Sequence, residues 1–280
     1  MWKNLTKEDL DKAYNNSLAV SNSATIVQSW TESSALAKVQ LNGECDIPYG
    51  KSKFQLFDYF PAKDNSPVIV FVHGGFWQMR SKNDFTFIVP ALVDAGFSIA
   101  MLGYTLAPHA KMDEIIVDVS NGLKAISNYL MKRNSKSSNF WLLGWSAGAH
   151  LISMVLEEES VMGGTAISGI YDLEPMRHCY INDKLNLDEK TSLENSPIKL
   201  DQVTSKALDI FVGGAELPEM QRQSIDFATY RKSLGAVEIF QSLPGKNHYT
   251  IMDELTSKKG VIMKTLINRL IIDSSIPILI

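Results

Sequence analysis

The chain has 280 residues, of which 45% are hydrophobic and 21% charged, with a formal net charge of −4. This length fits one large domain with room for a cap and a sizeable core, and without a clustered basic stripe we expect no nucleic-acid partner. No apolar run approaches the roughly 20 residues of a membrane helix and no signal-like segment follows Met1, so we expect a cytoplasmic protein without membrane contact.

The first predicted elements are helices. Thr6 can cap a helix whose first turn carries Glu8 and Asp9, where negative charge is favoured. A second helical pattern runs from about residue 24 to 39. This region precedes every strand signal and has no large core of its own. We therefore expect the N-terminal helical segment 1–45 to pack over the main domain as part of a cap.

Strands and helices then alternate along the chain. Strand signals lie at residues 54–60, 67–72, 98–102, 140–143, 165–168, 207–212 and 237–241. Helical patterns lie at residues 84–95, 112–131, 220–234 and 249–271, and directly after residue 146. The run 67–72 is apolar throughout, as expected of a strand buried on both faces. This alternation predicts a single α/β domain over 1–280, with a mostly parallel central sheet and helices on both faces.

Two segments do not fit the alternation. Residues 171–205 form a polar stretch with Pro175 and Pro197 that is too long for an ordinary connection. We expect this insertion to be a functional lid or a small helical unit, and to form the cap together with residues 1–45. Residues 275–280 are an apolar tail, which we expect to dock either on the body or on a partner.

The expected chemistry centres on residues 144–148, which read Gly-Trp-Ser-Ala-Gly. They lie between the apolar run 140–143 and a helical pattern that includes Leu151 and Val155. A strand that turns sharply into a helix through G-x-S-x-G is typical of a nucleophile elbow, whose glycines let a strained turn present the serine hydroxyl. Ser146 is therefore the candidate nucleophile. A serine acting only as a helix N-cap would leave the glycines unexplained.

A second glycine turn follows the most apolar strand directly, where residues 73–77 read His-Gly-Gly-Phe-Trp. Consecutive glycines can turn backbone N–H groups toward a neighbouring site, as in an HGG-type oxyanion loop. Gly74, Gly75 and Ala147 are the candidate oxyanion hole, in which each donor is typically worth about 10²–10³ in rate. A tight Gly-Gly turn without chemical purpose is the alternative. We expect His73 to brace the loop by hydrogen bonds.

The order Ser…acid…His selects the partners of the serine. His248 lies in the loop before the terminal helical stretch, where an α/β-hydrolase delivers its imidazole, and His178 is the weaker candidate. The acid should follow the strand at 207–212. Glu216 is nearest the strand end and Glu219 is the alternative. The acid's role is to fix the imidazole tautomer and to stabilise the imidazolium. If Glu216 has no catalytic role, its side chain is expected to be solvated.

Neither a metal nor a cofactor is expected. The glycine pair at 163–164 lacks the spacing of a dinucleotide fingerprint, and no His, Cys and Asp cluster has metal-ligand spacing. Cys45 and Cys179 lie far apart without a C-x-x-C pair, so two reduced thiols are the simplest interpretation, with a single bridge left open.

Several segments together carry a family resemblance. Beyond residues 73–77 and 144–150, the matching segments are Tyr-Thr-Leu-Ala-Pro at 104–108, Ser-Gly-Ile-Tyr-Asp-Leu at 168–173, Glu-Leu-Pro-Glu at 216–219 and Arg-Gln-Ser at 222–224. Over about residues 7–270 the chain resembles the kynurenine formamidase (arylformamidase) branch of the α/β-hydrolases, close to the hormone-sensitive-lipase-like esterases. The resemblance implies an α/β-hydrolase fold with a small helical cap, and it places the three candidate catalytic residues on the triad. Trp145 and Phe76 stand where His and Tyr are usual, and Glu216 stands where animal members have Asp.

The activity that this resemblance implies is hydrolysis of N-formyl-L-kynurenine to L-kynurenine and formate through an acyl-enzyme. A formyl group needs a tight acyl pocket beside a roomy aromatic one. Aromatic candidates for the pocket walls, which are as often plain packing residues, are Phe76, Trp77, Tyr104 and Trp145. A short-chain carboxylesterase or thioesterase with the same triad is the alternative, and a non-catalytic hydrolase-fold binding protein is less favoured. The expected partner is a small acyl amide or ester, and a homodimer stays open.

Overall fold

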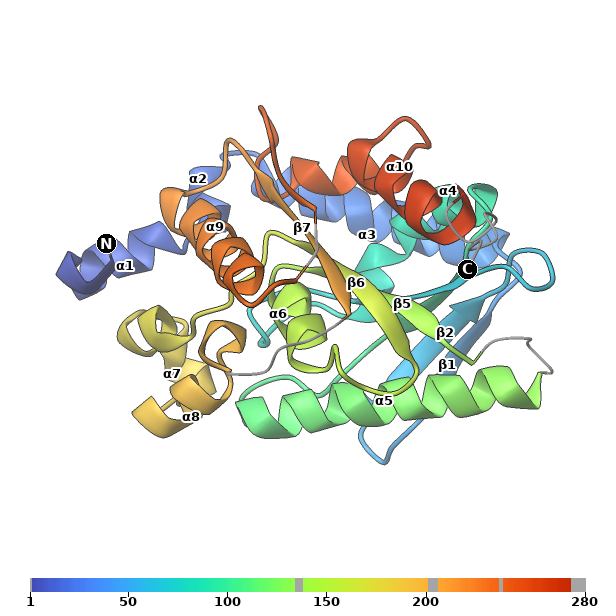
Figure 1. Cartoon of the computed structure of the whole chain (residues 1–280), viewed down its shortest axis with the longest axis horizontal. Coiled ribbons are helices and arrows are strands. Elements are labelled where there is room, and N and C mark those ends of the chain that lie inside the picture. The colour runs from blue at the N-terminus through green and yellow to red at the C-terminus, as the bar shows by residue number, and fades with distance from the viewer. Residues whose placement is uncertain (1, 134–137, 201–205, 237–238, 273–280) are drawn as a thin grey trace.

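The computed structural model describes residues 2–133, 138–200, 206–236 and 239–272 (Figure 1). Within these residues one eight-stranded sheet has the order β1-β2-β4-β3-β5-β6-β7-β8. The strands are β1 (Glu44–Pro48), β2 (Leu56–Phe60), β3 (Val68–Val72), β4 (Ser98–Leu102), β5 (Phe140–Trp145), β6 (Val161–Ile167), β7 (Ala207–Gly213) and β8 (Phe240–Leu243). The pairs β1–β2 and β2–β4 are antiparallel, and the five pairs from β4 across to β8 are parallel. The predicted mostly parallel α/β sheet is confirmed.

The side chains of β3 point alternately to the two faces of the sheet, and both faces are covered. Val68, Val70 and Val72 belong to one buried cluster, and Ile69 and Phe71 to the other, because successive strand side chains point to opposite faces. The first cluster is closed by α5 (Met112–Lys132), α6 (Ala147–Met154) and α9 (Pro218–Ser233). The second is closed by α3 (Ser23–Gln40), η2 (Lys82–Ile88), α4 (Val89–Asp94) and α10 (Val261–Ile267). The two clusters thus pack against opposite faces of the strands whose ends carry the site.

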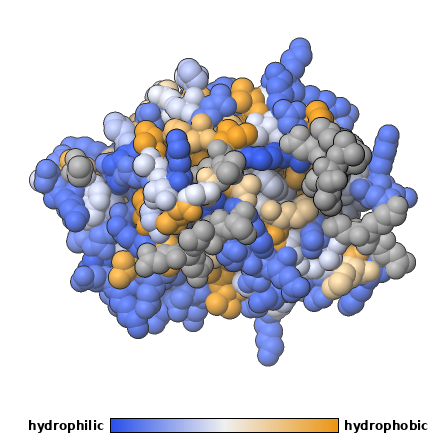
Figure 2. Space-filling model, in the orientation of Figure 1, coloured by the Kyte–Doolittle hydropathy of each residue, from blue (hydrophilic) through white to orange (hydrophobic). Residues whose placement is uncertain are grey.

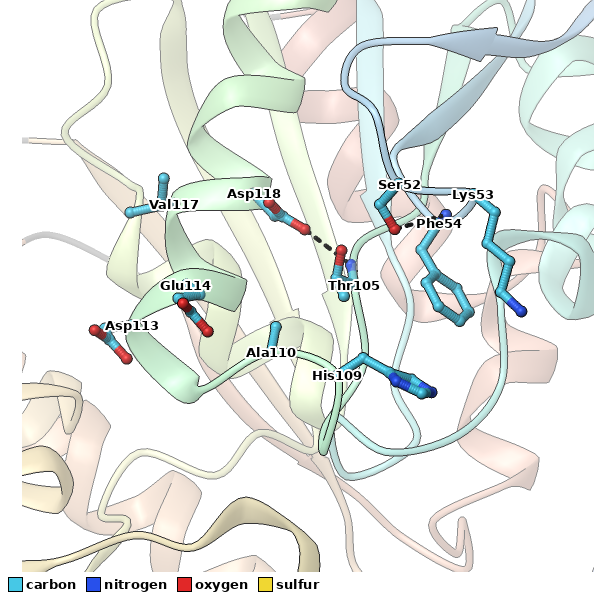
Figure 3. A pocket seen from close by; sticks show the side chains of 10 residues that line it. All are labelled: Ser52, Lys53, Phe54, Thr105, His109, Ala110, Asp113, Glu114, Val117 and Asp118. Carbon is cyan, nitrogen blue, oxygen red and sulfur yellow. Dashed lines mark hydrogen bonds between the residues drawn. The ribbon is translucent and has the colours of Figure 1, made fainter.

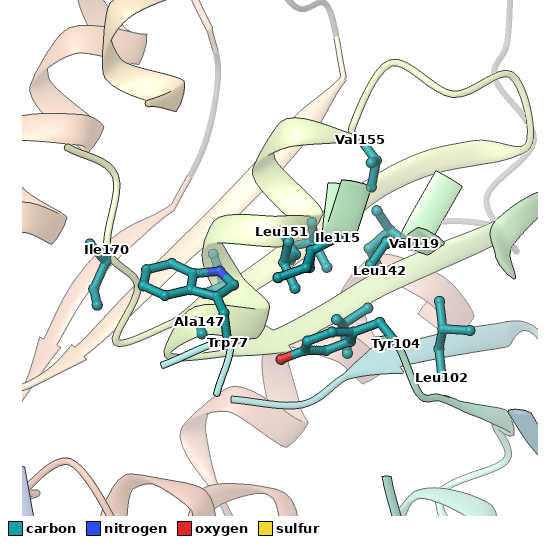
Figure 4. Close-up of a cluster of buried hydrophobic side chains, with 14 of the residues drawn as sticks. Trp77, Leu102, Tyr104, Ile115, Val119, Leu142, Ala147, Leu151, Val155 and Ile170 are labelled. Carbon is teal, nitrogen blue, oxygen red and sulfur yellow. The ribbon is translucent and has the colours of Figure 1, made fainter. Parts of the chain in front are cut away.

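Figure 4 shows part of the first layer, where Leu151 of α6 lies close to Ile115 of α5 and to Leu142 of β5. These side chains are buried, so α6 is held firmly against the sheet. On the outer face seen in Figure 2, apolar residues lie scattered among polar ones. None of the helices in the described ranges combines the length and the apolar character needed to cross a bilayer.

Short helices gather at one end of the molecule. In Figure 1, α1, α7 and α8 lie at the same end, beyond α6 and α9. The N-terminal helices are η1 (Trp2–Asn4), α1 (Lys7–Ala13) and α2 (Asn16–Ala19). The described part of the 171–205 insertion forms η3 (Glu174–His178), α7 (Asn182–Leu185), α8 (Glu189–Glu194) and η4 (Pro197–Lys199). This end therefore combines the first residues of the chain with a segment from its second half.

Three local expectations differ from the structure. Strand β1 was not predicted, and β6 begins at Val161, earlier than the predicted 165. The stretch 249–271, predicted as one helix, is instead η5 (Thr250–Leu255), a turn around Gly260, α10, and a short π-helical end η6 (Asn268–Ile272). The polar residues 256–260 interrupt the predicted helix between η5 and α10. Residues 237–238, 201–205 and the apolar tail 275–280 lie outside the described residues.

Candidate active site

Ser146 occupies a strained turn between β5 and α6. Its backbone has φ 56° and ψ −121°, a conformation that costs a non-glycine residue free energy and persists only when its surroundings enforce it. Its N–H donates to the Ile167 carbonyl at 2.8 Å, which ties the turn to β6. A Cβ on Gly148 would lie 2.0 Å from the Val72 carbonyl oxygen, so only glycine lets α6 begin this close to β3. The elbow geometry expected from the sequence is present.

His248 approaches Ser146 from the loop after β8. Its Nε2 lies 3.1 Å from the Ser146 Oγ, within hydrogen-bond reach. The Asn247 side chain accepts hydrogen bonds from the backbone N–H groups of Tyr249 and Thr250, and this Asx turn shapes the loop. The His248 carbonyl also accepts the Trp145 indole N–H at 3.0 Å. The imidazole is therefore held against the elbow from two sides.

Glu216 completes the series. The His248 Nδ1 lies 2.7 Å from the Glu216 Oε2. The other carboxylate oxygen accepts the Gly213 N–H at 2.7 Å and the Ser168 hydroxyl at 2.5 Å. All three members are buried, with Ser146 2%, His248 4% and Glu216 6% exposed. A carboxylate so placed selects the imidazole tautomer with its proton on Nδ1, which leaves Nε2 free to accept a proton from the serine.

Glu219, the alternative acid, is engaged elsewhere. Its Oε2 accepts the Tyr14 hydroxyl at 3.0 Å and the Arg222 guanidinium at 2.7 Å. The structure thus brings Glu216, and not Glu219, next to His248. His178 of the insertion is half-exposed, and its ring lies beside Trp2 and the carboxylate of Glu174.

The glycine loop after β3 lies directly against the elbow. A Cβ on Gly74 would lie 2.9 Å from the Ser146 Cβ and 2.6 Å from the Trp145 ring. Gly75 follows with φ +115°. Among the described residues, no partner accepts a hydrogen bond from the backbone N–H of Gly74, Gly75 or Ala147. N–H groups that lack partners beside a nucleophile suit the substrate carbonyl oxygen, which becomes negative when the nucleophile attacks.

Comparisons with known proteins find similarity to formamidases and esterases. The family model BD-FAE matches residues 58–165. The kynurenine formamidase of Danio rerio is 29% identical over 95% of this chain and 97% of its own length, and that of Salmo salar is 28% identical over 91% and 93%. A proposed thioesterase from Silicibacter sp. superposes with a TM-score of 0.83 at 24% identity, over 91% of this chain and 98% of that one. The chain has the α/β-hydrolase fold and is similar to kynurenine formamidases over most of its length.

The four aromatic pocket candidates of this kynurenine formamidase-like hydrolase have different surroundings. Phe76 is half-buried at the loop, with φ +49°. Trp77 is fully buried and its indole N–H donates to the His150 Nδ1 at 3.1 Å. The Tyr104 hydroxyl donates to the His73 carbonyl at 2.9 Å, and Trp145 stacks edge-on against Trp30. The buried three present little surface to a ligand, and the assignment of pocket walls remains a prediction.

Two further histidines are buried close to the site of this hydrolase. The His73 ring stacks on Tyr104, with centroids 4.3 Å apart, and its Nδ1 bonds the Gly74 carbonyl at 2.8 Å, in line with a bracing role. Burial lowers the pKa of His73 to about 4 and that of His150 to about 4. Both imidazoles are therefore neutral at pH 7, and neither adds positive charge beside the oxyanion loop.

Two of the cavities that the described residues form on the surface of this hydrolase are of a size to hold a ligand. One of about 640 Å³ lies between the loop after β4 and the N-terminal end of α5, and includes Phe54, His109 and Asp118 (Figure 3). Another of about 690 Å³ lies among η1, α8 and α9. Neither is lined by Ser146 or His248. Among the described residues, no group of His, Cys, Asp and Glu side chains could hold a metal ion, and Cys45 and Cys179 are free thiols.

Sequence reasoning missed Ser168. Its side chain is completely buried and donates to Glu216, and its backbone has φ +53°. It lies at the start of the matching segment 168–173, directly after β6, so its place at the carboxyl end of a central strand was a usable signal. Its contact with Glu216, which is 48 residues further on, was not visible in the sequence.

Proposed function

We propose that this hydrolase cleaves N-formyl-L-kynurenine to L-kynurenine and formate, with Ser146 as nucleophile, His248 as general base and acid, and Glu216 as the acid of the triad. The observation that carries the chemistry is the buried series of contacts at 3.1 Å and 2.7 Å that joins these three side chains. The similarity to two kynurenine formamidases over more than nine-tenths of the chain supports the substrate.

In the first step the Ser146 Oγ attacks the formyl carbon while the His248 Nε2 takes the hydroxyl proton. The carbonyl oxygen becomes negative, and the free N–H groups of the glycine loop and of Ala147 bind it. Glu216 stabilises the imidazolium that forms. Because these donors are fixed by strained backbone before substrate arrives, they stabilise the charge without reorganising.

In the second step His248 gives its proton to the aniline nitrogen, the C–N bond breaks, and the arylamine leaves with the formyl group held as an ester on Ser146. Water then attacks the formyl carbon, with His248 taking one of its protons. The ester bond breaks, formate departs, and the proton returns to the Ser146 oxygen. One water is consumed, and the enzyme is restored.

The end of the molecule that holds the short helices acts as a cap within a single domain in this proposal. The Tyr14 hydroxyl reaches Glu219, the Ser17 hydroxyl lies 3.0 Å from that of Tyr249, and Asp11 accepts the Tyr180 N–H at 2.6 Å. These contacts bind the N-terminal helices to α9, to the histidine loop and to the insertion. A cover of this kind excludes water from the acyl-enzyme until the amine has left.

Turnover of N-formyl-L-kynurenine and of p-nitrophenyl acetate by the wild type and by Ser146→Ala tests the proposal, with fluorophosphonate labelling as a second readout. We expect labelling at Ser146 and a higher kcat/KM on the formamide, both abolished in the variant. Turnover of the ester alone would identify a short-chain esterase. A wild-type chain that neither labels nor hydrolyses would be a non-catalytic binding protein.

A further inference from the structure

The loop that carries the oxyanion donors has positive φ at three consecutive residues, two of which are not glycine. Gly75, Phe76 and Trp77 have φ of +115°, +49° and +60°. Glycine adopts such values freely, but for Phe and Trp they are unfavourable. A strained backbone of this kind persists only where neighbouring groups fix it. The loop therefore needs an external restraint to keep its N–H groups in place.

The side chain of Trp77 supplies the contact for that restraint. It is 0% exposed, and its indole N–H donates to the Nδ1 of His150 at 3.1 Å. The two rings meet edge to face, with centroids 5.0 Å apart and an interplanar angle of 89°. The Trp77 carbonyl in turn accepts the Ala107 N–H at 2.8 Å. Trp77 is thus held at both its side chain and its backbone.

His150 stands on α6 one turn after the nucleophile, and its backbone N–H lies 3.2 Å from the Ser146 carbonyl oxygen. Its Nε2 lies 2.7 Å from the carbonyl oxygen of Asn195, the residue after α8. An indole N–H can only donate and a carbonyl can only accept, so Nδ1 is unprotonated and Nε2 carries the hydrogen. Both ring nitrogens are occupied, which leaves His150 no capacity to transfer a proton during the reaction.

We propose that His150 is a positioning residue, which through Trp77 fixes the strained oxyanion loop relative to the helix that carries Ser146. The proposal rests on the proposed hydrolase function, because it assigns the loop's N–H groups to a developing oxyanion. Donors aimed at that oxyanion lose effect steeply when displaced, so loss of the restraint lowers the rate of the chemical step more than substrate binding. The same imidazole links the insertion to the site through Asn195.

The test compares His150→Phe, which keeps a planar ring and loses both hydrogen bonds, with His150→Gln, whose amide offers one acceptor and one donor. Ser153→Ala on the same helix is the control, since within the described part of the chain its hydroxyl bonds the Ala149 carbonyl alone. We expect His150→Phe to lower kcat by about 10- to 100-fold with KM changed by less than about threefold. His150→Gln should recover most of that loss, and Ser153→Ala should match the wild type.

Trp77→Phe removes the same hydrogen bond from the other side and provides a second route if His150→Phe does not fold. We expect a similar fall in kcat and in the rate of fluorophosphonate labelling, and a double variant no slower than the worse single one. A wild-type kcat in folded His150→Phe or in Trp77→Phe overturns the positioning role. If the wild type itself neither labels nor turns over substrate, the proposed hydrolase function fails instead.

Discussion

Replacement of Glu216 by glutamine is the sharpest test of the assigned triad. The Gly213 N–H donates to one carboxylate oxygen, and a backbone N–H cannot become an acceptor. The amide oxygen of Glu216→Gln must therefore take that position, and the amide NH₂ must face the Nδ1 of His248. Since NH₂ donates, Nδ1 becomes the acceptor and the imidazole proton moves to Nε2, where it blocks transfer from the serine.

This tautomer change sets the size of the expected effect. In a serine protease, the corresponding Asp-to-Asn replacement, which also leaves the wrong imidazole tautomer, lowers kcat by about 10⁴. A loss of about 10³–10⁴ in kcat corresponds to roughly 4–5 kcal/mol of activation free energy. The fold should change little, because glutamine has nearly the same shape and the Gly213 contact is kept.

Glu219→Gln is the matched control, three residues along the same segment. It weakens the contacts with Tyr14 and Arg222, both outside the triad, so kcat should stay within about threefold of the wild type. Steady-state turnover of the formamide, with thermal unfolding to verify folding, separates the two variants. The assignment would be refuted if Glu216→Gln kept more than a tenth of the wild-type kcat, or if Glu219→Gln lost more kcat than Glu216→Gln.

Three further outcomes are expected. Gly74→Ala puts a methyl group 2.9 Å from the nucleophile's Cβ, so kcat should fall by about 10²-fold or more in steady-state assays while the chain stays folded. Burial lowers the pKa of His73 and of His150 from 6.5 to about 4. The contribution of the two neutral imidazoles to the free energy of unfolding is therefore fully present above pH 6.5 and is lost as the pH falls toward 4. Urea titrations should show the free energy of unfolding falling by about 1 kcal/mol per pH unit for each as pH drops toward 4. Lys82→Met removes the 2.6 Å partner of the fully buried Asp58 but leaves Lys38 at 3.3 Å, so the free energy of unfolding should fall by about 2 kcal/mol in the same assay at pH 7.

The sheet was predictable because its central strands are apolar on both faces. Burial of every residue of β3 and β4 leaves a continuous hydrophobic run that a sequence shows directly. Strand β1 gives no such signal, since it is an edge strand with four exposed residues and contains Asp46 at φ +58°. The stretch after Tyr249 has helical periodicity throughout, but the polar turn before Gly260 divides it. Periodicity alone did not reveal that division.

The site was predictable in its parts that lie at strand ends. Ser146, Glu216 and His248 each follow a strand, and parallel strands place their carboxyl ends together. The supporting contacts of Ser168 and His150 depend on side-chain direction and on loop conformations of positive φ. Neither follows from spacing along the chain. The aromatic candidates show the same limit, because residue type indicated a pocket wall while burial places Trp77 in the packed interior.

The N-terminal helices meet partners that are far away along the chain. Tyr14 contacts Glu219 at a separation of 205 residues, and Ser17 contacts Tyr249 at a separation of 232. During synthesis these helices are made long before their partners, so they cannot complete their contacts until the chain has been extended past Tyr249. The sheet and the elbow can assemble in the meantime with the nucleophile uncovered. Synthesis of the segment around Tyr249, rather than formation of the core, is then the event that lets the proposed cap close over the reacting groups.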